Sequence, residues 1–492
     1  MYILIIVSIV IAICLSSSLF KASEIKRDGK ALRRPPNTLP LVGNGILFLQ
    51  ARHKLFSWFV KCERKFGFET FEISVPSLPP GVVINDPKNL EYVLKNEGVF
   101  AKGDFFKRRS WDLFGNGIIN ADGDLWKVQR KAGLNFLNVA NLKALTDVAL
   151  RDCLVEALAQ LTSAKDGKIV DLEAVFHELT TKLMGRMAYN MDMRSGDPFS
   201  LAFEYASGAT GERFQNPLWP ITEILFGGRF RSSIAKVKDF GAEIVSNAIR
   251  TRREQKKMGT EPSSLDLISG TLINSLLDSI DDHQMVADAA LNYLSAGRDT
   301  TAQALTWTFY LLMRHPKVMD KVRVQLSCLV SEHLYKATLK PTEVPYIMAV
   351  FYESLRLYPP VPFEIKQCEQ ATTLPDGTFL PKNSVLVWCP WAMNRSKTSW
   401  GEDADDFKPE RWLEDGILMS KTAFEFPVFN GGTRTCLGKK MAEVVAIQVI
   451  AMLSVNFNFS PINGKERISK NSLTLPMEGG LPCRVSIYHG SA

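Results

Sequence analysis

The stretch that most constrains this chain is residues 429–438, which read F-N-G-G-T-R-T-C-L-G. Cys436 can supply a thiolate, which is a soft metal ligand, and the glycines around it let the backbone turn tightly and approach a flat cofactor. Arg434, two residues before Cys436, carries a permanently charged guanidinium group that can bind a carboxylate. Phe429 can keep water away from the sulfur. A glycine-rich turn with an inert, buried cysteine is the alternative for any lone cysteine. Because all the defining residues fall at F-x-x-G-x-R-x-C-x-G spacing, we favour an iron site.

This stretch resembles the haem-binding signature of the cytochrome P-450 monooxygenases at every defining position. The resemblance implies that the chain binds haem b (iron protoporphyrin IX) with Cys436 as the axial thiolate. It also implies that Phe429, Arg434 and Gly438 contact the cofactor. The implied fold is mainly α: a large single-domain haem-thiolate monooxygenase fold with a small β-rich lobe, plus an N-terminal transmembrane helix.

The length of the chain leaves its domain organisation open. With 492 residues, 46% of them hydrophobic, it can bury a large core, and length alone would suggest roughly two to four domains. No long linker, internal repeat or low-complexity tract divides it. We therefore expect one catalytic domain over residues 41–492, preceded by a transmembrane anchor at 1–20 and a basic, proline-rich hinge at 21–40.

The anchor is predicted from residues 2–20, which carry no charge and are dominated by Ile, Val and Leu. A helix of that length, rising about 1.5 Å per residue, just spans the core of a bilayer. A cleaved signal peptide is the alternative, and it is disfavoured because the basic residues follow the apolar run instead of preceding it. Positive flanks stay cytosolic, so we expect a single-pass protein of the endoplasmic reticulum membrane whose catalytic domain faces the cytosol. The hinge resembles that of microsomal members of the family.

Charge and cysteine content exclude some classes of protein. The net charge of +7 is modest for this size and shows no long basic run with interleaved aromatics, which argues against nucleic acid as a partner. The eight cysteines are scattered and include no C-x-x-C pair. That usage fits reducing cytosol better than a secreted disulfide scaffold.

Three further residues are expected near the haem. Trp126 and Arg130 lie four apart, so both project from one face of an expected helix. Alone, such a pair is usually a packed tryptophan beside a surface arginine. Together with the cysteine stretch it resembles the family's W-x-x-x-R, which implies that both bind a haem propionate. Lys366 stands where many members place an Arg or His for the same purpose, although lysine lacks the guanidinium fork.

The longest expected helix covers residues 281–315 and contains A-G-R-D-T-T at 296–301. Gly297 inside a helix costs about 1 kcal/mol relative to alanine, so we expect a reason for it. A hydroxyl and a carboxylate here can loosen the backbone bonding and leave a groove for dioxygen and water. A surface aspartate followed by ordinary helix threonines is the alternative. The segment resembles the family's [AG]-G-x-[DE]-T-[TS], which implies that Asp299 and Thr300 deliver protons during oxygen activation.

Two further predictions concern structure outside the haem site. Glu353 and Arg356, with Arg411 downstream, resemble the family's buried Glu-Arg-Arg network, whose role is structural. Residues 98–123 are rich in Phe and Gly, and we expect a long binding loop there.

The finer resemblance is to the plant and fungal fatty-acid ω-hydroxylase branch, in which V-P-x-x-x-K is a familiar variant. It is carried by the blocks at 120–131, 355–366, 374–379, 400–413 and 426–439. It implies terminal hydroxylation of a long-chain fatty acid, whose carboxylate a basic group such as Lys107, Arg108 or Arg109 would hold. Hydroxylation of an alkane, sterol or terpenoid is the alternative within the same chemistry. A haem-thiolate protein that binds a ligand or rearranges a peroxide is the alternative of another class, and the acid-alcohol pair disfavours it.

The partners implied are O2, a lipophilic small molecule and a diflavin reductase that uses NADPH, as in microsomal members. Four lysines flank the expected haem site in sequence: Lys127, Lys131, Lys439 and Lys440. They form either a basic patch for an acidic electron donor or a merely solvated face.

Overall fold

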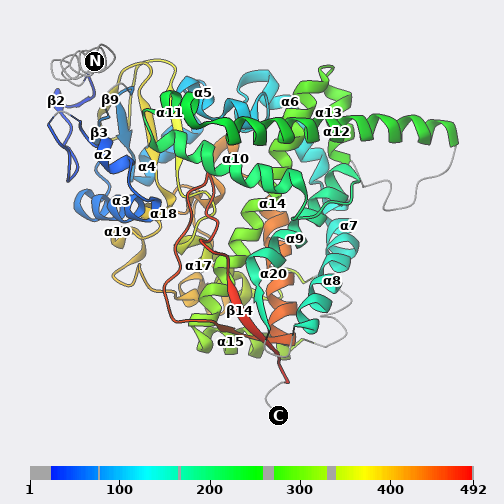
Figure 1. Cartoon of the computed structure of the whole chain (residues 1–492). Helices are drawn as coiled ribbons and strands as arrows, with labels where there is room; N and C mark the ends of the chain where they lie inside the picture. The colour runs from blue at the N-terminus through cyan, green and yellow to red at the C-terminus, as the bar shows by residue number, and fades with distance from the viewer. Residues whose placement is uncertain are drawn as a thin grey trace.

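A mainly helical body carries a smaller lobe of short strands on its N-terminal side (Figure 1). The predicted membrane anchor, residues 1–20, lies outside the described residues. The computed structural model describes residues 24–40, 42–75, 78–164, 168–258, 271–329 and 339–489. Within those ranges no helix has both the length and the apolar character needed to cross a membrane.

The body is built around α14 (His283–Arg314), which runs through its centre in Figure 1. Asp282 caps this helix by accepting hydrogen bonds from two backbone N–H groups of the first turn. His315, the residue before Pro316, leaves the helical conformation and ends it. The prediction of a long helix over residues 281–315 is therefore confirmed. The helices packed around α14 include α9 (Leu172–Met184), α12 (Gly228–Met258), α13 (Thr271–Ser279), α17 (Pro345–Leu357) and α20 (Lys439–Asn456).

The remaining helices cover the two ends and the outer surface of the body. The α-helices are α2 (Gly45–Phe48), α3 (Arg52–Phe66), α4 (Pro87–Lys95), α5 (Gly103–Phe114), α6 (Gly123–Phe136), α7 (Val139–Ala144), α8 (Leu150–Ser163), α10 (Pro198–Gln215), α11 (Trp219–Phe226), α15 (Pro316–Ser327), α18 (Pro390–Met393) and α19 (Lys397–Trp400). Short π and 3-10 turns are η1 (Leu145–Ala149), η2 (Gly185–Tyr189), η3 (Pro409–Trp412), η4 (Pro427–Phe429) and η5 (Gly432–Arg434).

The strand lobe is a five-stranded sheet of order β3-β4-β10-β7-β5. Its strands are β3 (Phe71–Ile73), β4 (Gly81–Val83), β10 (Val385–Trp388), β7 (Glu364–Cys368) and β5 (Phe100–Ala101). Only β4 and β10 run parallel, with Val385 opposite Gly81. In antiparallel register, Lys366 of β7 lies opposite Leu386 of β10.

Three smaller sheets complete the strands. β1 (Lys26–Arg27), β2 (Lys30–Ala31), β8 (Thr372–Thr373) and β9 (Thr378–Leu380) form one of them, so part of the segment expected as a hinge pairs with the folded body. The others are β11 (Leu413–Glu414) with β12 (Ile417–Leu418), and β13 (Phe457–Pro461), β14 (Pro482–Ile487) and β6 (Ile169–Asp171).

The prediction of a long loop over residues 98–123 is wrong, because most of its middle forms α5. Gly103 and Gly115 bound this helix with positive φ values of 69° and 48°, which let the chain turn sharply at both ends. The high glycine and phenylalanine content hid the helical spacing of its buried face. That face consists of Gly103, Arg109, Ser110, Leu113 and Phe114.

The predicted Glu-Arg-Arg network is confirmed. The carboxylate of Glu353 and the guanidinium of Arg356 are both completely buried, and they form two hydrogen bonds of 2.8 Å. Arg411 adds a bond of 2.9 Å from Nε, and the indole N–H of Trp412 adds another of 2.9 Å. Arg356 also donates to the backbone carbonyls of Asn394, Ala404 and Asp406. The network therefore joins α17 to the segment that leads to η3.

Replacing Arg356 by methionine should strongly destabilise the fold, because it leaves a buried carboxylate and three carbonyl groups short of donors. We expect Arg356→Met to lower the free energy of unfolding by about 3–5 kcal/mol. The measurement is urea denaturation followed by far-ultraviolet circular dichroism. The control is Arg186→Met, whose ion pair with Asp152 is half exposed and should contribute about 1 kcal/mol or less. Equal losses in the two variants would contradict a dominant role for the buried network.

Candidate functional site

The cysteine loop, residues 429–438, is held in place by close backbone contacts. Asn430 and Gly432 have φ values of 57° and 63°, in the left-handed region. A Cβ on Gly432 would come within 2.1 Å of the carbonyl oxygen of Leu94, so the loop rests directly on the end of α4. The backbone N–H of Cys436 donates to the carbonyl of Phe429 at 2.7 Å and closes the loop. This geometry places Cys436 just before the N-terminus of α20.

The thiol of Cys436 faces a space inside the protein. Its residue surface is exposed, yet burial raises the pKa of this thiol, while the backbone N–H groups of Gly438 and Lys439 oppose that rise. The two observations agree if the accessible surface is internal. Ala296, in the middle of the otherwise buried α14, is exposed in the same way. Two accessible patches on buried elements are what a flat cofactor would cover, so the residues present fit a haem.

The pair predicted from W-x-x-x-R meets the cysteine loop. Arg130 donates from Nη1 to the carbonyl of Thr435 at 2.6 Å, directly beside Cys436. The ring of Trp126 lies 5.9 Å from the guanidinium carbon of Arg130 and 4.9 Å from that of Arg434. α6 and the cysteine loop therefore bring four of the predicted residues together.

α14 joins the same junction through Tyr293, whose hydroxyl donates to the carbonyl of Gln129 in α6 at 2.7 Å. A Cβ on Gly133 would meet that hydroxyl at 2.4 Å and Leu437 Cδ1 at 2.8 Å. The absence of a side chain at Gly133 is thus what lets α6, α14 and the cysteine loop approach one another.

The cations of the cluster differ in how they are paired. Arg434 binds two carboxylates, Glu97 at 2.5 Å and Asp122 at 2.6 Å. Lys366, 2% exposed, donates to the carbonyl of Phe100 at 2.8 Å. Burial, with the nearby charges of Arg434 and Lys102, lowers the pKa of Lys366 to about 8. Among the described residues, neither Lys366 nor Arg130 has a carboxylate within 4.0 Å.

Asp299 and Thr300 lie away from this cluster and point in different directions. The carboxylate of Asp299 accepts a hydrogen bond from Arg298 Nε at 2.6 Å and lies 3.9 Å from His177 Nδ1. It lines a polar cavity, whose walls also include Glu204 and Lys470. Burial lowers the pKa of His177.

Thr300 shares its helix face with the exposed Ala296. Its Oγ1 donates to the carbonyl of Ala296 at 2.7 Å, and the helix runs unbroken through this segment. A Cβ on Gly297 would come within 2.5 Å of Met184 Sδ. Close packing of α9 against α14 is therefore a reason for this glycine that the sequence did not indicate.

A second cavity is apolar and lies between α3, α5, α10 and the five-stranded sheet. Its lining includes Phe59, Phe105, Phe106, Phe214, Phe363 and Leu473. Two polar residues in this lining, Arg52 and Gln215, were missed by the sequence analysis. No sequence signal distinguishes them, because an arginine at a helix start and a glutamine at a helix end both look like ordinary surface residues.

Gly432→Ala should disturb the cysteine loop more than left-handed backbone strain alone can explain. We expect a marked loss of haem content and a fall of about 2–4 kcal/mol in the free energy of unfolding, because Leu94 must also move. The control is Gly416→Ala, whose φ of 79° is equally left-handed but whose Cβ would meet nothing within 4 Å. Haem absorbance per protein and urea denaturation provide the measurements. If the two variants behave alike, the contact with Leu94 does not position the loop.

Comparison with known proteins agrees with this geometry. The cytochrome P450 family model matches residues 34–483. The chain is 33% identical over 425 residues to Cytochrome P450 86B1 of Arabidopsis thaliana, covering 80% of this chain and 75% of the relative. It is 32% identical to Cytochrome P450 monooxygenase cyp1 of Mycosarcoma maydis, covering 92% of this chain and 76% of that one, and 29% identical to Cytochrome P450 94A1 of Vicia sativa, covering 92% and 90%. Because the family model spans most of the chain, this protein belongs to the cytochrome P450 family and is a haem-thiolate monooxygenase.

Proposed function

We propose that this monooxygenase hydroxylates the terminal region of a long-chain fatty acid, with Cys436 as the axial ligand of haem b. The observation that carries the substrate class is the apolar cavity, which is lined by aromatic and aliphatic side chains. Leu473 lines this cavity, and the next two residues are hydrogen bonded to Gln303 of α14 at 2.9 and 2.8 Å. Leu473, on the wall of the cavity, is therefore linked through its neighbours to α14 close to Thr300.

When bound, the haem supplies the oxidising chemistry that inserts one atom of dioxygen into a C–H bond. The N-terminal end of α20 assists by stabilising the thiolate form of Cys436 through its free N–H groups. Phe429, which accepts the backbone hydrogen bond of Cys436, would shield the sulfur from water. Gly438, whose Cβ position lies 3.9 Å from the sulfur, leaves room beside it.

Arg130 and Lys366 are proposed to bind the two haem propionates. Each is a cation that donates to one backbone carbonyl and lacks a carboxylate partner among the described residues. An unpaired cation in a buried site is unfavourable, so an anion is expected there. Trp126 and Arg434 complete the site, with Arg434 already neutralised by Glu97 and Asp122.

Asp299 and Thr300 are proposed to carry protons from the polar cavity to the face of α14 on which Ala296 and Thr300 lie. Asp299 faces that cavity with Arg298 and His177, while the hydroxyl of Thr300 lies on the face where α14 is accessible. Because adjacent residues of an α-helix point about 100° apart, the two connect neighbouring faces of the helix.

Exposed residues on the surface support a proposal for how electrons reach the haem. Lys127, Lys131, Lys439 and Lys440 are exposed on the two helices that flank Cys436, which suits an acidic diflavin reductase that uses NADPH. A single-pass anchor in the endoplasmic reticulum would hold the domain at the cytosolic surface.

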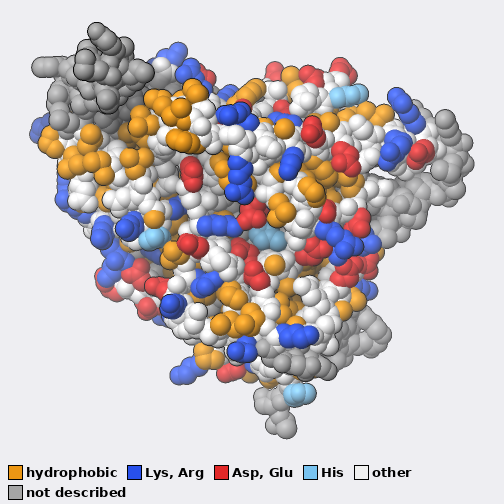
Figure 2. Space-filling model, in the orientation of Figure 1, with side chains coloured by type: hydrophobic (Ala, Val, Ile, Leu, Met, Phe, Trp, Pro, Cys, Tyr) orange, Lys and Arg blue, Asp and Glu red, His pale blue; other side chains and the backbone are white. Residues whose placement is uncertain are grey.

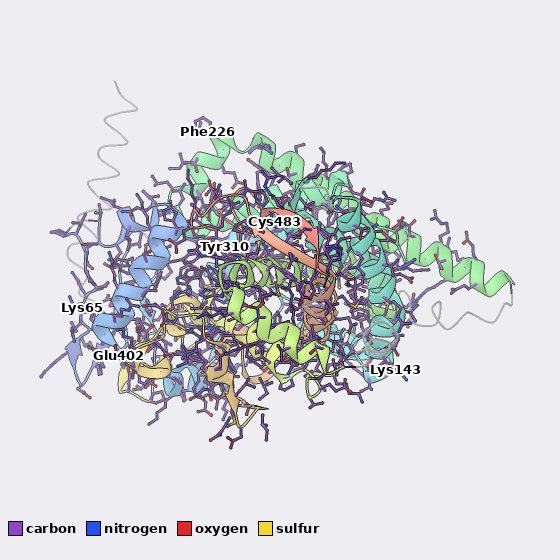
Figure 3. The ribbon with its side chains drawn as sticks, turned by 90° about the horizontal axis from the view of Figure 1, so that it is seen from below. Lys65, Lys143, Phe226, Tyr310, Glu402 and Cys483 are labelled. Carbon is purple, nitrogen blue, oxygen red and sulfur yellow. The ribbon has the colours of Figure 1, made fainter. Side chains whose placement is uncertain are left out.

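An apolar surface supports membrane contact. α11 buries none of its residues, and Figure 2 shows hydrophobic side chains gathered over α2 and α11. Phe226 projects away from the body in Figure 3. The exposed apolar residues of this region are Leu39, Ile46, Leu49, Leu218, Ile221, Ile224, Leu225 and Phe226. Patches of this kind mark interaction sites.

Removing the hydroxyl of Thr300 should uncouple electron use from product formation. For Thr300→Val we expect hydroxylated product per NADPH consumed to fall at least about tenfold, with hydrogen peroxide released instead, because a proton donor is lost. Thr308→Val is the control, since Thr308 makes the same 2.7 Å bond to the carbonyl four residues earlier but is completely buried. Unchanged coupling in Thr300→Val would remove Thr300 from the proton route.

The substrate class is tested by spectral titration and product analysis with the membrane-bound protein and a diflavin reductase. Saturated fatty acids of graded length should give a type I shift and yield ω-hydroxy acids, identified by mass spectrometry. The matched comparison is with n-alkanes of the same carbon number, a sterol and a terpenoid. If no fatty acid gives a spectral shift or an ω-hydroxy product, the proposal is wrong. Efficient turnover of an alkane, a sterol or a terpenoid would identify that class as the substrate instead.

A further inference from the structure

Arg52, the first residue of α3, is a buried cation without a counter-ion. Its side chain is 8% exposed and lines the apolar cavity. Its guanidinium makes one hydrogen bond, from Nη1 to Asn471 Oδ1 at 3.2 Å, and Nε is buried without a partner. The rings of Phe56 and Phe363 lie 5.6 and 5.7 Å from the guanidinium carbon. Among the described residues, no carboxylate lies within 4.0 Å of it.

Several other buried arginines among the described residues have more partners, although Arg395 resembles Arg52 in making one hydrogen bond, to the carbonyl of Trp391 at 3.2 Å, and no ion pair. Arg213, Arg298 and Arg356 each form a short ion pair with a carboxylate. Arg109 has no such pair, but it donates to two backbone carbonyls. Burial lowers the pKa of Arg52 to about 10, so it stays charged at neutral pH. A buried charge that lacks a counter-ion is unfavourable, so an anion that entered this cavity would be stabilised by Arg52.

Gln215, the last residue of α10, is a second unsatisfied donor on the same cavity. Its Nε2 is buried and has no hydrogen-bond partner. A buried donor left unbonded costs about 1–3 kcal/mol, so native structures rarely keep one without a reason. The remaining lining is largely apolar.

Arg52 and the helix that carries Gln215 both contact the segment of residues 471–473. Arg52 is bonded to Asn471, and a Cβ on Gly211, one turn before Gln215, would come within 2.7 Å of the backbone of Ser472. Glu212 interacts with Asn471, and among the described residues it forms no ion pair with Arg52.

We propose that Arg52 and Gln215 bind the carboxylate of the substrate, with the apolar tail lying along the aromatic and aliphatic lining of the cavity. Two carboxylate oxygens can accept from both donors, which a neutral head group cannot match. This inference rests on the proposed fatty-acid hydroxylation and adds the residues that orient the chain. Holding the head group fixes one end of the substrate, which favours oxidation at a set distance from the carboxylate.

The structure does not favour the basic residues named from sequence for this task. Lys107 forms an ion pair with Asp122 at 2.7 Å. Arg109 donates hydrogen bonds to the backbone carbonyls of Arg213 and Phe105. Neither they nor Arg108 belong to the described lining of the apolar cavity.

The test compares a long-chain fatty acid with its methyl ester, which has the same tail and no charge. For Arg52→Met we expect the dissociation constant of the acid from type I titration to rise at least about tenfold, and that of the ester to change less than about twofold. Arg52→Lys should keep part of the preference for the acid. Gln215→Met should weaken acid binding by about threefold or more. The control is Arg64→Gln in the same helix, whose ion pair with Asp405 is on the surface, and it should change neither ligand.

The site of hydroxylation gives an independent readout. In Arg52→Met the product mixture should shift from ω-hydroxy acid towards in-chain positions, because the head group is no longer held. Equal weakening of acid and ester, or no change in either, would overturn the assignment of Arg52. If Arg52→Met does not incorporate haem, Gln215→Met and Arg52→Lys decide the question. Failure of the wild-type protein to bind any fatty acid would instead refute the proposed substrate class.

Discussion

The structure beneath the haem site depends on one buried carboxylate. Glu353 has no exposed surface, and it accepts hydrogen bonds from Arg356, Arg411 and Trp412. Trp412 stacks edge-on against Phe426 at 4.9 Å, immediately before the segment that leads to the cysteine loop. Because a charge inside a protein is tolerated only when its partners are in place, this network sets the position of the loop as well as that of α17.

One short segment, residues 472–474, contributes to both cavities. Ser472 and Thr474 line the polar cavity, while Leu473 lines the apolar one. Three successive residues therefore contribute to the walls of both cavities. Asp299 lies on the polar side of this segment.

Most of the regular structure could be predicted from local sequence. The helix over 281–315 and the helix after Cys436 carry clear start and stop signals, and the β3–β4 pairing follows from the Pro- and Gly-rich stretch around it. α5 could not be predicted, because its burial depends on neighbours far along the chain, including α10, α14 and β7. The roles of the site residues remain proposals, although Trp126, Arg130, Arg434 and Cys436 do lie together.

By itself, the sequence determined the haem-thiolate chemistry, because the cysteine loop and its arginine lie within ten residues and their spacing is a local property. Only the tertiary structure decided which charges are compensated. Arg434 proved to be neutralised by Glu97 and Asp122, whereas Arg52 proved to have no carboxylate partner among the described residues and Gln215 Nε2 proved to have no hydrogen-bond partner there. Whether a polar group is satisfied depends on segments hundreds of residues away, such as Asn471 for Arg52. Such long-range pairing leaves no pattern in the neighbouring residues, and so substrate orientation could be inferred only from the folded chain.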